Sequence, residues 1–156
     1  MQTLDNIDNN ILRILQNDGR ISIVNLAERV GLTKTPCLTR LRRLEKTGYI
    51  DGYQARINPH KVDQSYLVYV QIKLENTTSQ TLRNFNQAAK ATPDIMSCHM
   101  LSGGYDYLLK IRTRDMASYR ELLGDVIASL PGVLTTASFP VMEEVMDRAT
   151  IRISGT

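Results

Sequence analysis

The sequence predicts an α+β protein, in which a helical first part precedes a second part built around a β-sheet. Two patterns along the 156 residues support this fold class. Apolar residues recur every three or four positions up to about residue 47, as in amphipathic helices, and from Tyr66 they alternate with a period of two, as in half-buried strands. Strand and helix patterns then follow in the order β-α-β-β-α-β. We therefore expect two units, over residues 1–60 and 61–156.

The first thirty residues predict two short amphipathic helices. Asp5 and Ser22 are suited to be their N-caps, because each side chain can accept a hydrogen bond from the first helical turn. Residues 17–19 end the first helix and Gly31 ends the second. The apolar faces are formed by residues at helical spacing: Leu4, Ile7, Ile11, Ile14 and Leu15 in the first helix, and Ile23, Leu26, Ala27 and Val30 in the second.

A third helix is predicted over Pro36–Thr47. Thr35 is its expected N-cap, Pro36 suits the first helical position, where its missing N–H does no harm, and Gly48 ends it. At about 100° per residue, one side gathers apolar side chains: Cys37, Leu41 and Leu44, with Leu38 flanking. The opposite side carries a hydroxyl and cations: Thr39, Arg42, Arg43 and Lys46, with Arg40 at the margin.

Two short helices, a tight turn and a basic third helix are the plan of a helix-turn-helix DNA-binding motif, which we place at about residues 23–42. Lys34–Lys46 contains five basic residues and one acid, whereas residues 61–156 hold ten of each sign. The major groove accepts one α-helix, Arg can bridge guanine O6 and N7, and cations near phosphates displace counterions. The alternative is a merely solvated basic face, and the clustering of charge after a tight turn favours DNA.

A small hairpin, or wing, is predicted after the third helix. Residues 49–53 read YIDGY, and Tyr53, Ala55 and Ile57 then alternate as in a strand. Such a wing could contact the DNA backbone through Arg56 or simply cover the helices, and the sequence leaves both readings open.

The second part predicts a ferredoxin-like βαββαβ arrangement, with four antiparallel strands and both helices on one face. The strands are expected over Tyr66–Leu74, Ile95–Leu101, Tyr105–Arg112 and Val133 to about Val145, with a further edge strand over Ala149–Ile153. One helix ends before Pro93 and turns Leu82, Phe85 and Ala89 inward. The other is capped by Asp115 and turns a longer set inward: Met116, Tyr119, Leu123, Val126, Ile127 and Leu130.

The opposite face of this sheet would be uncovered and partly apolar. The contributing residues are Leu67, Tyr69, Met100, Leu108 and Phe139. An apolar sheet face invites a partner, and a second copy of the chain is the simplest one. A two-fold dimer would also place two helix-turn-helix units on two DNA half-sites.

Composition and motifs argue against several function classes. No run approaches the ~18 apolar residues of a membrane span, and the first residues do not resemble a signal peptide. Cys37 and Cys98 are lone and far apart, which favours a reducing compartment over a metal knuckle. His60 and His99 have no neighbouring ligands at metal spacing. Hydrolase, metalloprotease and P-loop motifs are absent from the sequence, so we expect no enzyme, no metal and no cofactor beyond an effector.

Five motifs occur in order along the chain: TPCL-x-R-x-RRLE, YIDGY, DYLLK, LPGV and MEEV. Together they resemble the Lrp/AsnC, or feast/famine, family of transcription regulators over nearly the whole length. The resemblance implies a winged helix-turn-helix joined to an effector domain often called the regulation-of-amino-acid-metabolism (RAM) domain. It implies a cytoplasmic, nucleoid-associated protein that binds operator DNA and responds to a small molecule, usually an amino acid. It also implies homodimers that assemble further, commonly to octamers.

Site residues carry over by position. The implied DNA-binding residues are Thr33, Lys34, Thr35, Thr39, Arg40, Arg42, Arg43 and Lys46. The implied effector-binding residues are Met100, Leu101, Ser102, Gly103, Gly104, Tyr105, Asp106, Met116, Phe139, Pro140 and Val141. Two of these depart from the pattern that the resemblance implies, which has an acidic residue in place of Gly104 and a β-branched residue in place of Pro140. Proline cannot donate to a strand ladder, so a bulge or an edge is expected there.

The stretch Ser102–Asp106 contains a glycine pair that a hairpin turn explains by itself. A phosphate-binding loop is excluded, because a strand and not a helix follows. The turn does not explain Asp106 within an otherwise apolar strand. Bare backbone N–H groups could hold a ligand carboxylate, and Asp106 could hold its ammonium group. The alternative function is an amino-acid-binding regulator that does not bind DNA, which the Lys34–Lys46 charge opposes.

Overall fold

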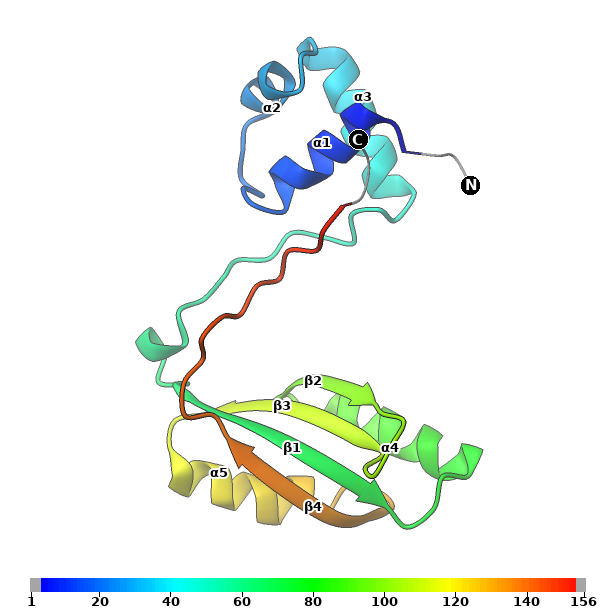
Figure 1. The fold of residues 1–156 in the computed structure, drawn as a ribbon, viewed down its shortest axis with the longest axis vertical. Coiled ribbons are helices and arrows are strands. Elements are labelled where there is room, and N and C mark those ends of the chain that lie inside the picture. The colour runs from blue at the N-terminus through cyan, green and yellow to red at the C-terminus, as the bar shows by residue number, and fades with distance from the viewer. Residues whose placement is uncertain (1–3, 154–156) are drawn as a thin grey trace. The chain divides into compact units, whose positions relative to one another are not determined.

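A computed structural model describes residues 4–153 of the chain, which form two compact units (Figure 1). One unit reaches to Arg56 and resumes at Met146, and the other spans Ile57–Val145. The chain therefore leaves the first unit a few residues before the expected boundary at 60. It also returns to that unit near its end, so the last described residues do not group with the sheet.

Helices α1 (Asn6–Leu15) and α2 (Ile23–Arg29) begin where the sequence predicts. The Asp5 side chain accepts from the N–H of Asp8 at 2.8 Å, and Asp8 accepts in return from the N–H of Asp5 at 3.2 Å. This reciprocal arrangement is a capping box. Ser22 caps α2 through the N–H of Asn25 at 3.2 Å. Gly31 follows α2 with a φ of 70°, a left-handed conformation that glycine adopts without strain.

Helix α3 (Lys34–Lys46) begins two residues earlier than the sequence suggests. Its N-cap is Thr33, which makes no side-chain cap hydrogen bond, so the prediction of Thr35 as N-cap is wrong. Pro36 then lies in the first turn rather than at the first position. A proline there does not destabilise the helix, because the first N–H groups of a helix have no intrahelical acceptor.

The three helices enclose one apolar core. Its fully or nearly fully buried members come from all of them: Ile11, Leu26, Ala27, Cys37 and Leu44. The predicted inward side of α3 is confirmed by Cys37 and Leu44, each 0% exposed.

The expected wing hairpin does not form, because residues 50–58 contain no strand. The segment is held to α3 by a hydrogen bond from the Tyr53 hydroxyl to Glu45, 3.0 Å long. It leads into a single 3₁₀ turn, η1 (Pro59–Lys61). The predicted strand alternation fails here because no neighbouring strand accepts or donates the ladder hydrogen bonds.

The C-terminal segment lies on α1 and not at a sheet edge. The Gln16 side chain donates to the carbonyl of Ile151 (3.1 Å) and accepts from its N–H (3.0 Å). Arg13 donates to the carbonyl of Ile153, and Arg56 to that of Asp147. The prediction of an edge strand over 149–153 is therefore wrong, because side chains bond the backbone that a strand partner would have bonded.

The second unit has the predicted ferredoxin-like order. The elements are β1 (Tyr66–Leu74), α4 (Ser79–Ala91), β2 (Ile95–Met100), β3 (Tyr107–Thr113), α5 (Met116–Leu122), the π-helical turn η2 (Leu123–Ile127) and β4 (Val133–Pro140). All pairings are antiparallel and the strand order is β2-β3-β1-β4, so β1 and β3 are central (Figure 1). The core gathers alternate residues of the central strands with residues of both helices, among them Val70, Ile72, Leu109, Phe85 and Tyr119.

Three predicted details of this unit are wrong. Strand β4 ends at Pro140, not near Val145, because a proline has no N–H with which to continue the ladder. The last backbone bond there runs from the N–H of Val141 to the carbonyl of Leu67, 2.9 Å. The β2–β3 turn is longer than expected, since β3 begins at Tyr107. Met116 is 56% exposed and does not face the core.

The structure confirms that one face of the sheet is not covered by helices, but one residue predicted to lie on that face lies on the other. Strand register places Leu67, Tyr69 and Leu108 there, and Phe139 opposite Tyr69. Met100 pairs with the buried Tyr107, which puts it on the helix-covered side instead. Leu67 is already buried within the single chain, whereas Phe139 is 49% exposed.

Candidate functional site

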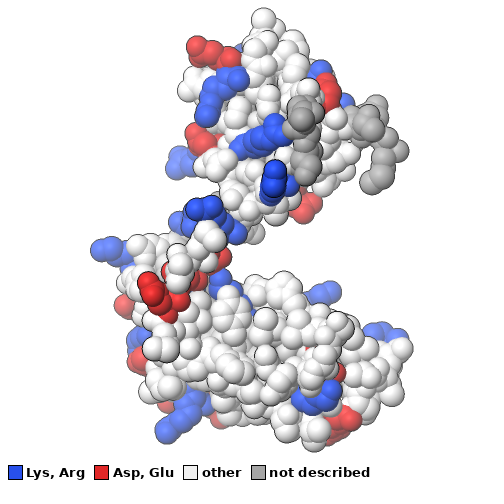
Figure 2. All heavy atoms as spheres, viewed as in Figure 1, with Lys and Arg blue, Asp and Glu red and all other residues white. Residues whose placement is uncertain are grey.

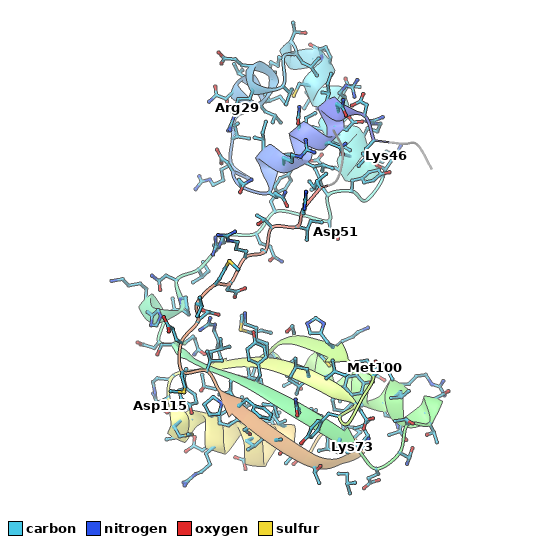
Figure 3. All side chains as sticks on the ribbon, viewed as in Figure 1. Arg29, Lys46, Asp51, Lys73, Met100 and Asp115 are labelled. Carbon is cyan, nitrogen blue, oxygen red and sulfur yellow. The ribbon has the colours of Figure 1, made fainter. Side chains whose placement is uncertain are left out.

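The exposed side of α3 retains most of the predicted DNA-binding residues. Thr33, Lys34, Thr35, Thr39, Arg42 and Lys46 are all exposed. Lys46 lies at the C-terminal end of the helix (Figure 3). Within the described part of the chain, Lys34, Arg42 and Lys46 have no ion-pair partner. On the face drawn in Figure 2, Lys and Arg are interspersed with Asp and Glu.

Arg40 and Arg43 have a different environment from the other cations of α3. Arg40 donates to Asp5 at 2.6 Å and to Asp8 at 2.9 Å, and Arg43 donates to the other oxygen of Asp8. The Asp8 side chain is 1% exposed, whereas those of Arg40 and Arg43 are 29% and 36% exposed. Two of the predicted DNA-binding cations therefore fasten α3 to α1.

Hydrogen bonding in this cluster favours the charged forms of Asp5 and Arg40. The pKa of Asp5 is lowered, first by the hydrogen bond from the Asp8 N–H and then by the bond from Arg40. The pKa of Arg40 is raised, first by its bond to Asp5 and then by that to Asp8. The two carboxylates at the start of α1 and the two guanidinium groups of α3 thus balance one another's charge.

The predicted effector turn lies at one end of the sheet, between β2 and β3. Asp106 is buried, and its carboxylate accepts from the N–H of Leu74 at 2.7 Å and from Lys73 Nζ at 3.3 Å. The Asp106 N–H donates to the carbonyl of Ile72 at 2.8 Å. Asp106 thus satisfies backbone hydrogen-bonding groups at the end of β1. These hydrogen bonds are a structural reason for an acidic residue at that position.

The remaining predicted effector residues lie at the other end of the sheet. Met116 accepts a hydrogen bond at its sulfur from the Tyr66 hydroxyl, 3.2 Å away, at the first residue of β1. Phe139 and Pro140 pair with Tyr69 and Val68. Figure 3 shows Lys73 and Met100 at one end of the sheet and Asp115, which precedes Met116, at the other. At about 3.3 Å per residue along β1, roughly 25 Å separates the level of Met116 from that of Asp106, and roughly 15–20 Å separates the level of Phe139 and Pro140 from it.

Neither a metal centre nor a membrane span is found among residues 4–153. No three His, Cys, Asp or Glu side chains gather as metal ligands would, and none of the helices is long and apolar enough to cross a bilayer. Glu144 is paired with Arg112 at 2.6 Å.

The two units thus combine a helix-turn-helix with an exposed basic third helix and a ferredoxin-like domain with two groups of candidate ligand-binding residues. Family models match both units. Residues 4–51 match a winged helix-turn-helix DNA-binding model, and residues 67–151 match the Lrp/AsnC ligand binding domain. This combination defines a DNA-binding transcription regulator with a ligand-binding domain.

Relatives and solved structures agree with this class. The leucine-responsive regulatory proteins of Escherichia coli K12 and Klebsiella pneumoniae are each 53% identical over 142 residues, covering 91% of this chain and 87% of theirs. The crystal structure of a Neisseria meningitidis transcriptional regulator in complex with L-methionine has a TM-score of 0.91 at 31% identity, covering 96% of this chain and 97% of that one. An AsnC family regulator from Agrobacterium tumefaciens has a TM-score of 0.90 at 30% identity, with the same shares covered.

The chain belongs to the Lrp/AsnC family. Its members are transcription regulators and not enzymes.

Proposed function

We propose that the chain binds operator DNA by placing α3 in the major groove. The observation that supports this proposal is the set of exposed side chains along α3, in which Lys34, Arg42 and Lys46 have no ion-pair partner among the described residues. Arg42 is the residue we assign to base reading, because a guanidinium group can bridge two acceptors of guanine. Lys34 and Lys46, at the two ends of the helix, would bind phosphates. Thr33, Thr35 and Thr39 would add neutral hydrogen bonds, and Arg40 and Arg43 would hold the helix in place.

We further propose that the second unit binds a small effector, with an amino acid as the first candidate. One support is the L-methionine complex of the Neisseria relative, and another is the name of the leucine-responsive relatives. The candidate ligand residues of one chain lie at opposite ends of its sheet, so a complete pocket would need a second subunit. The uncovered sheet face offers an interface for a dimer, and dimers would assemble further, to an octamer in the fullest form.

In this proposal the protein acts in the cytoplasm on nucleoid DNA and controls genes of amino-acid metabolism. An effector must bind one assembly or one spacing of the DNA-binding units more tightly than another, or it changes nothing. The effector therefore regulates transcription by shifting that balance.

The DNA part is tested by selecting bound sequences from a random duplex pool and measuring the affinity of the best one from low to high salt. We expect a specific sequence and a log–log salt slope of about −0.9 for each phosphate contact. A protein that enriches no sequence, and whose binding shows no salt dependence, would contradict the proposal.

The effector part is tested by a thermal-shift screen against the twenty amino acids, followed by DNA titration with any ligand found. A ligand at about 100 times its Kd stabilises one site by about 2.7 kcal/mol, which is a measurable shift. If none of the amino acids shifts the melting temperature, an amino-acid effector is excluded while the DNA proposal stands.

A further inference from the structure

On the exposed side of α3, the hydroxyl of Thr39 has already committed its proton within the helix. It donates to the carbonyl of Thr35, one turn earlier, at 3.0 Å. A hydroxyl has one donor and two acceptor lone pairs, so Thr39 can accept a further hydrogen bond but can donate one only by breaking this bond. Because the side chain is exposed, α3 presents there a γ-methyl group and an acceptor oxygen.

Thr35 differs from Thr39 in this respect, although both are exposed threonines of α3. Thr35 is the second residue of the helix, so the backbone one turn before it lies outside the helix and offers its side chain no equivalent carbonyl. None of residues 4–153 forms a hydrogen bond with its hydroxyl. Thr35 can therefore donate or accept, whereas Thr39 is held as an acceptor.

Thr39 lies beside Arg42 on the surface of the helix. At about 100° per residue, one stripe along α3 holds four exposed side chains that fall within about 60° of one another: Thr35, Thr39, Arg42 and Lys46. Thr39 and Arg42 are about 4.5 Å apart along the helix axis, and successive base pairs of DNA are about 3.4 Å apart. With α3 in the major groove, Thr39 therefore faces a base pair within about two positions of the guanine assigned to Arg42.

Base pairs differ in how well they match a methyl group beside an acceptor oxygen. In the major groove, guanine presents only acceptors, whereas thymine presents a methyl group beside its O4. Adenine carries an amino donor at N6, and cytosine carries one at N4. A T·A pair thus offers both a methyl group for the Thr39 methyl and a donor for its oxygen. A G·C pair offers a donor but no methyl group.

We propose that Thr39 selects a T·A base pair close to the Arg42 guanine, through contact between its γ-methyl group and the methyl group of thymine. The bond to Thr35 supports this preference, because a guanine acceptor would compete with the Thr35 carbonyl for the same proton. The inference rests on the proposed binding of operator DNA by α3. It goes beyond that proposal by assigning a base identity to one position of the operator.

Base analogues locate the contact on the operator obtained by selection. 7-Deazaguanine lacks the N7 acceptor, so the guanine at which it weakens wild type but not Arg42→Ala marks the position of Arg42. Deoxyuridine lacks only the methyl group of thymine and replaces each thymine of the operator in turn. We expect one replacement, within about two positions of the marked guanine, to weaken wild type about fourfold, as for one buried methylene-sized group.

Two variants separate the methyl group of Thr39 from its hydroxyl. Thr39→Ser keeps the hydroxyl and lacks the γ-methyl group, so it should bind the thymine and deoxyuridine operators equally well. Thr39→Val keeps a γ-methyl group and lacks the oxygen, so it should retain the roughly fourfold preference for thymine. Thr35→Ser is the matched control, because it removes the same methyl group from the other threonine of the stripe and should leave that preference unchanged.

5-Methylcytosine supplies the converse test, because it carries a methyl group at the same place in the major groove. Replacing the selected T·A pair by C·G should weaken wild type at least about fivefold, the lower end for a mismatched pair. The methylated C·G pair should recover about fourfold of this loss in wild type and none of it in Thr39→Ser. Urea unfolding of each variant verifies that the fold is intact.

The outcomes distinguish this inference from the proposed function. If wild type and Thr39→Ser respond alike to deoxyuridine at every thymine, the inference is overturned and specific operator binding stands. Thr39→Ser and Thr39→Val that lose the same affinity on all sequences would also overturn it, and would place Thr39 on a phosphate. If wild type enriches no sequence and its binding shows no salt dependence, the DNA proposal and the inference fail together.

Discussion

At the scale of residues, the buried carboxylate of Asp8 decides which cations of α3 are available for DNA. It binds Arg43 and shares Arg40 with Asp5, so these two guanidinium groups are drawn toward α1. A buried charge that loses a partner is costly, whereas an exposed cation without a partner costs little. Arg42 and Arg43 are adjacent in sequence, yet they should respond differently to removal.

We predict that Arg43→Ala lowers the free energy of unfolding by about 1–3 kcal/mol, because it leaves Asp8 with an unmet hydrogen bond. Arg42→Ala should change stability by no more than about 0.5 kcal/mol, as expected for an exposed side chain. In operator binding the order reverses, since Arg42→Ala should weaken affinity by about 1–3 kcal/mol. Urea unfolding and DNA titration measure the two quantities.

Measuring DNA affinity at several salt concentrations distinguishes the same two variants in a second way. If Arg43 binds a phosphate instead, Arg43→Ala will reduce the log–log salt slope by roughly one unit and leave stability near wild type. That result would return Arg43 to the DNA-binding set and leave α3 anchored through Arg40 alone.

The lowered pKa of Asp5 predicts a dependence of stability on acid. A carboxyl with a lower pKa in the folded state stabilises the fold above its ordinary value of 3.8, and this contribution is lost as pH falls through the folded value. Asp5→Asn keeps a good helix cap and removes the charge. The stability difference between wild type and Asp5→Asn should therefore be largest near neutral pH and shrink below about pH 4. A difference that is constant with pH would exclude the charge of Asp5 as its source.

The sequence could predict the role of Asp5 as a cap but not its pairing with Arg40. Capping depends on residues three positions apart, whereas this ion pair joins residues 35 apart in sequence. A usable signal did exist. Asp5 and Asp8 lie on one face of α1, and Arg40 and Arg43, also three apart, lie on one face of α3. Matching the two pairs would have suggested that the cations at this spacing face α1.

At the scale of elements, β2 shows why strand phase is hard to read from sequence. Its register with β3 shifts between Ile95 and Ser97, so the alternation of inward and outward residues reverses partway along the strand. A one-residue shift moves every later side chain to the opposite face. Met100 therefore lies on the helix-covered side. Strand β1 has no irregularity before Lys73, and Leu67 and Tyr69 were correctly predicted to lie on the uncovered face.

The segment after α3 carries a prediction of its own. The pKa of Tyr53 is raised from 10.0 to about 12, first by burial and then by its hydrogen bond to Glu45. Because the folded pKa is the higher one, the resulting stabilisation is complete below about pH 10 and is lost as pH rises toward about 12.

Tyr53→Phe retains the ring and removes this titration. We expect the phenolate absorbance of wild type to include one tyrosine that ionises near pH 12 and is absent in the variant. The stability of wild type should also fall more steeply between about pH 10 and about pH 12. If the absorbance that wild type has and the variant lacks appears near pH 10 instead, Tyr53 ionises normally and its contact with Glu45 is weak.

At the scale of the whole molecule, the period-two and helical patterns were sufficient for the fold of each unit but not for the assignment of the last residues. Gln16 and Arg13 bond the backbone of Ile151 and Ile153, and such side-chain-to-backbone bonds leave no periodic signal. The effector site was incompletely predictable for a related reason. Residue positions carried over from the family specify which side chains take part, but not whether one chain or two bring them together.

The uncovered sheet face supports the last prediction, which concerns self-association. Phe139 is 49% exposed on that face, opposite Tyr69. Leu134 is 59% exposed on the same strand, at the register shift near its start and away from Phe139. If the uncovered face is the dimer interface, Phe139→Asp places a charge in an apolar contact, a change that costs several kcal/mol when the charge has no partner. Sedimentation velocity without ligand should then show Phe139→Asp shifted to monomer, while Leu134→Asp stays assembled. Dissociation of Leu134→Asp alone would place the interface near the start of β4 instead, and assembly of both variants at wild-type size would mean that neither residue is needed for the subunits to associate.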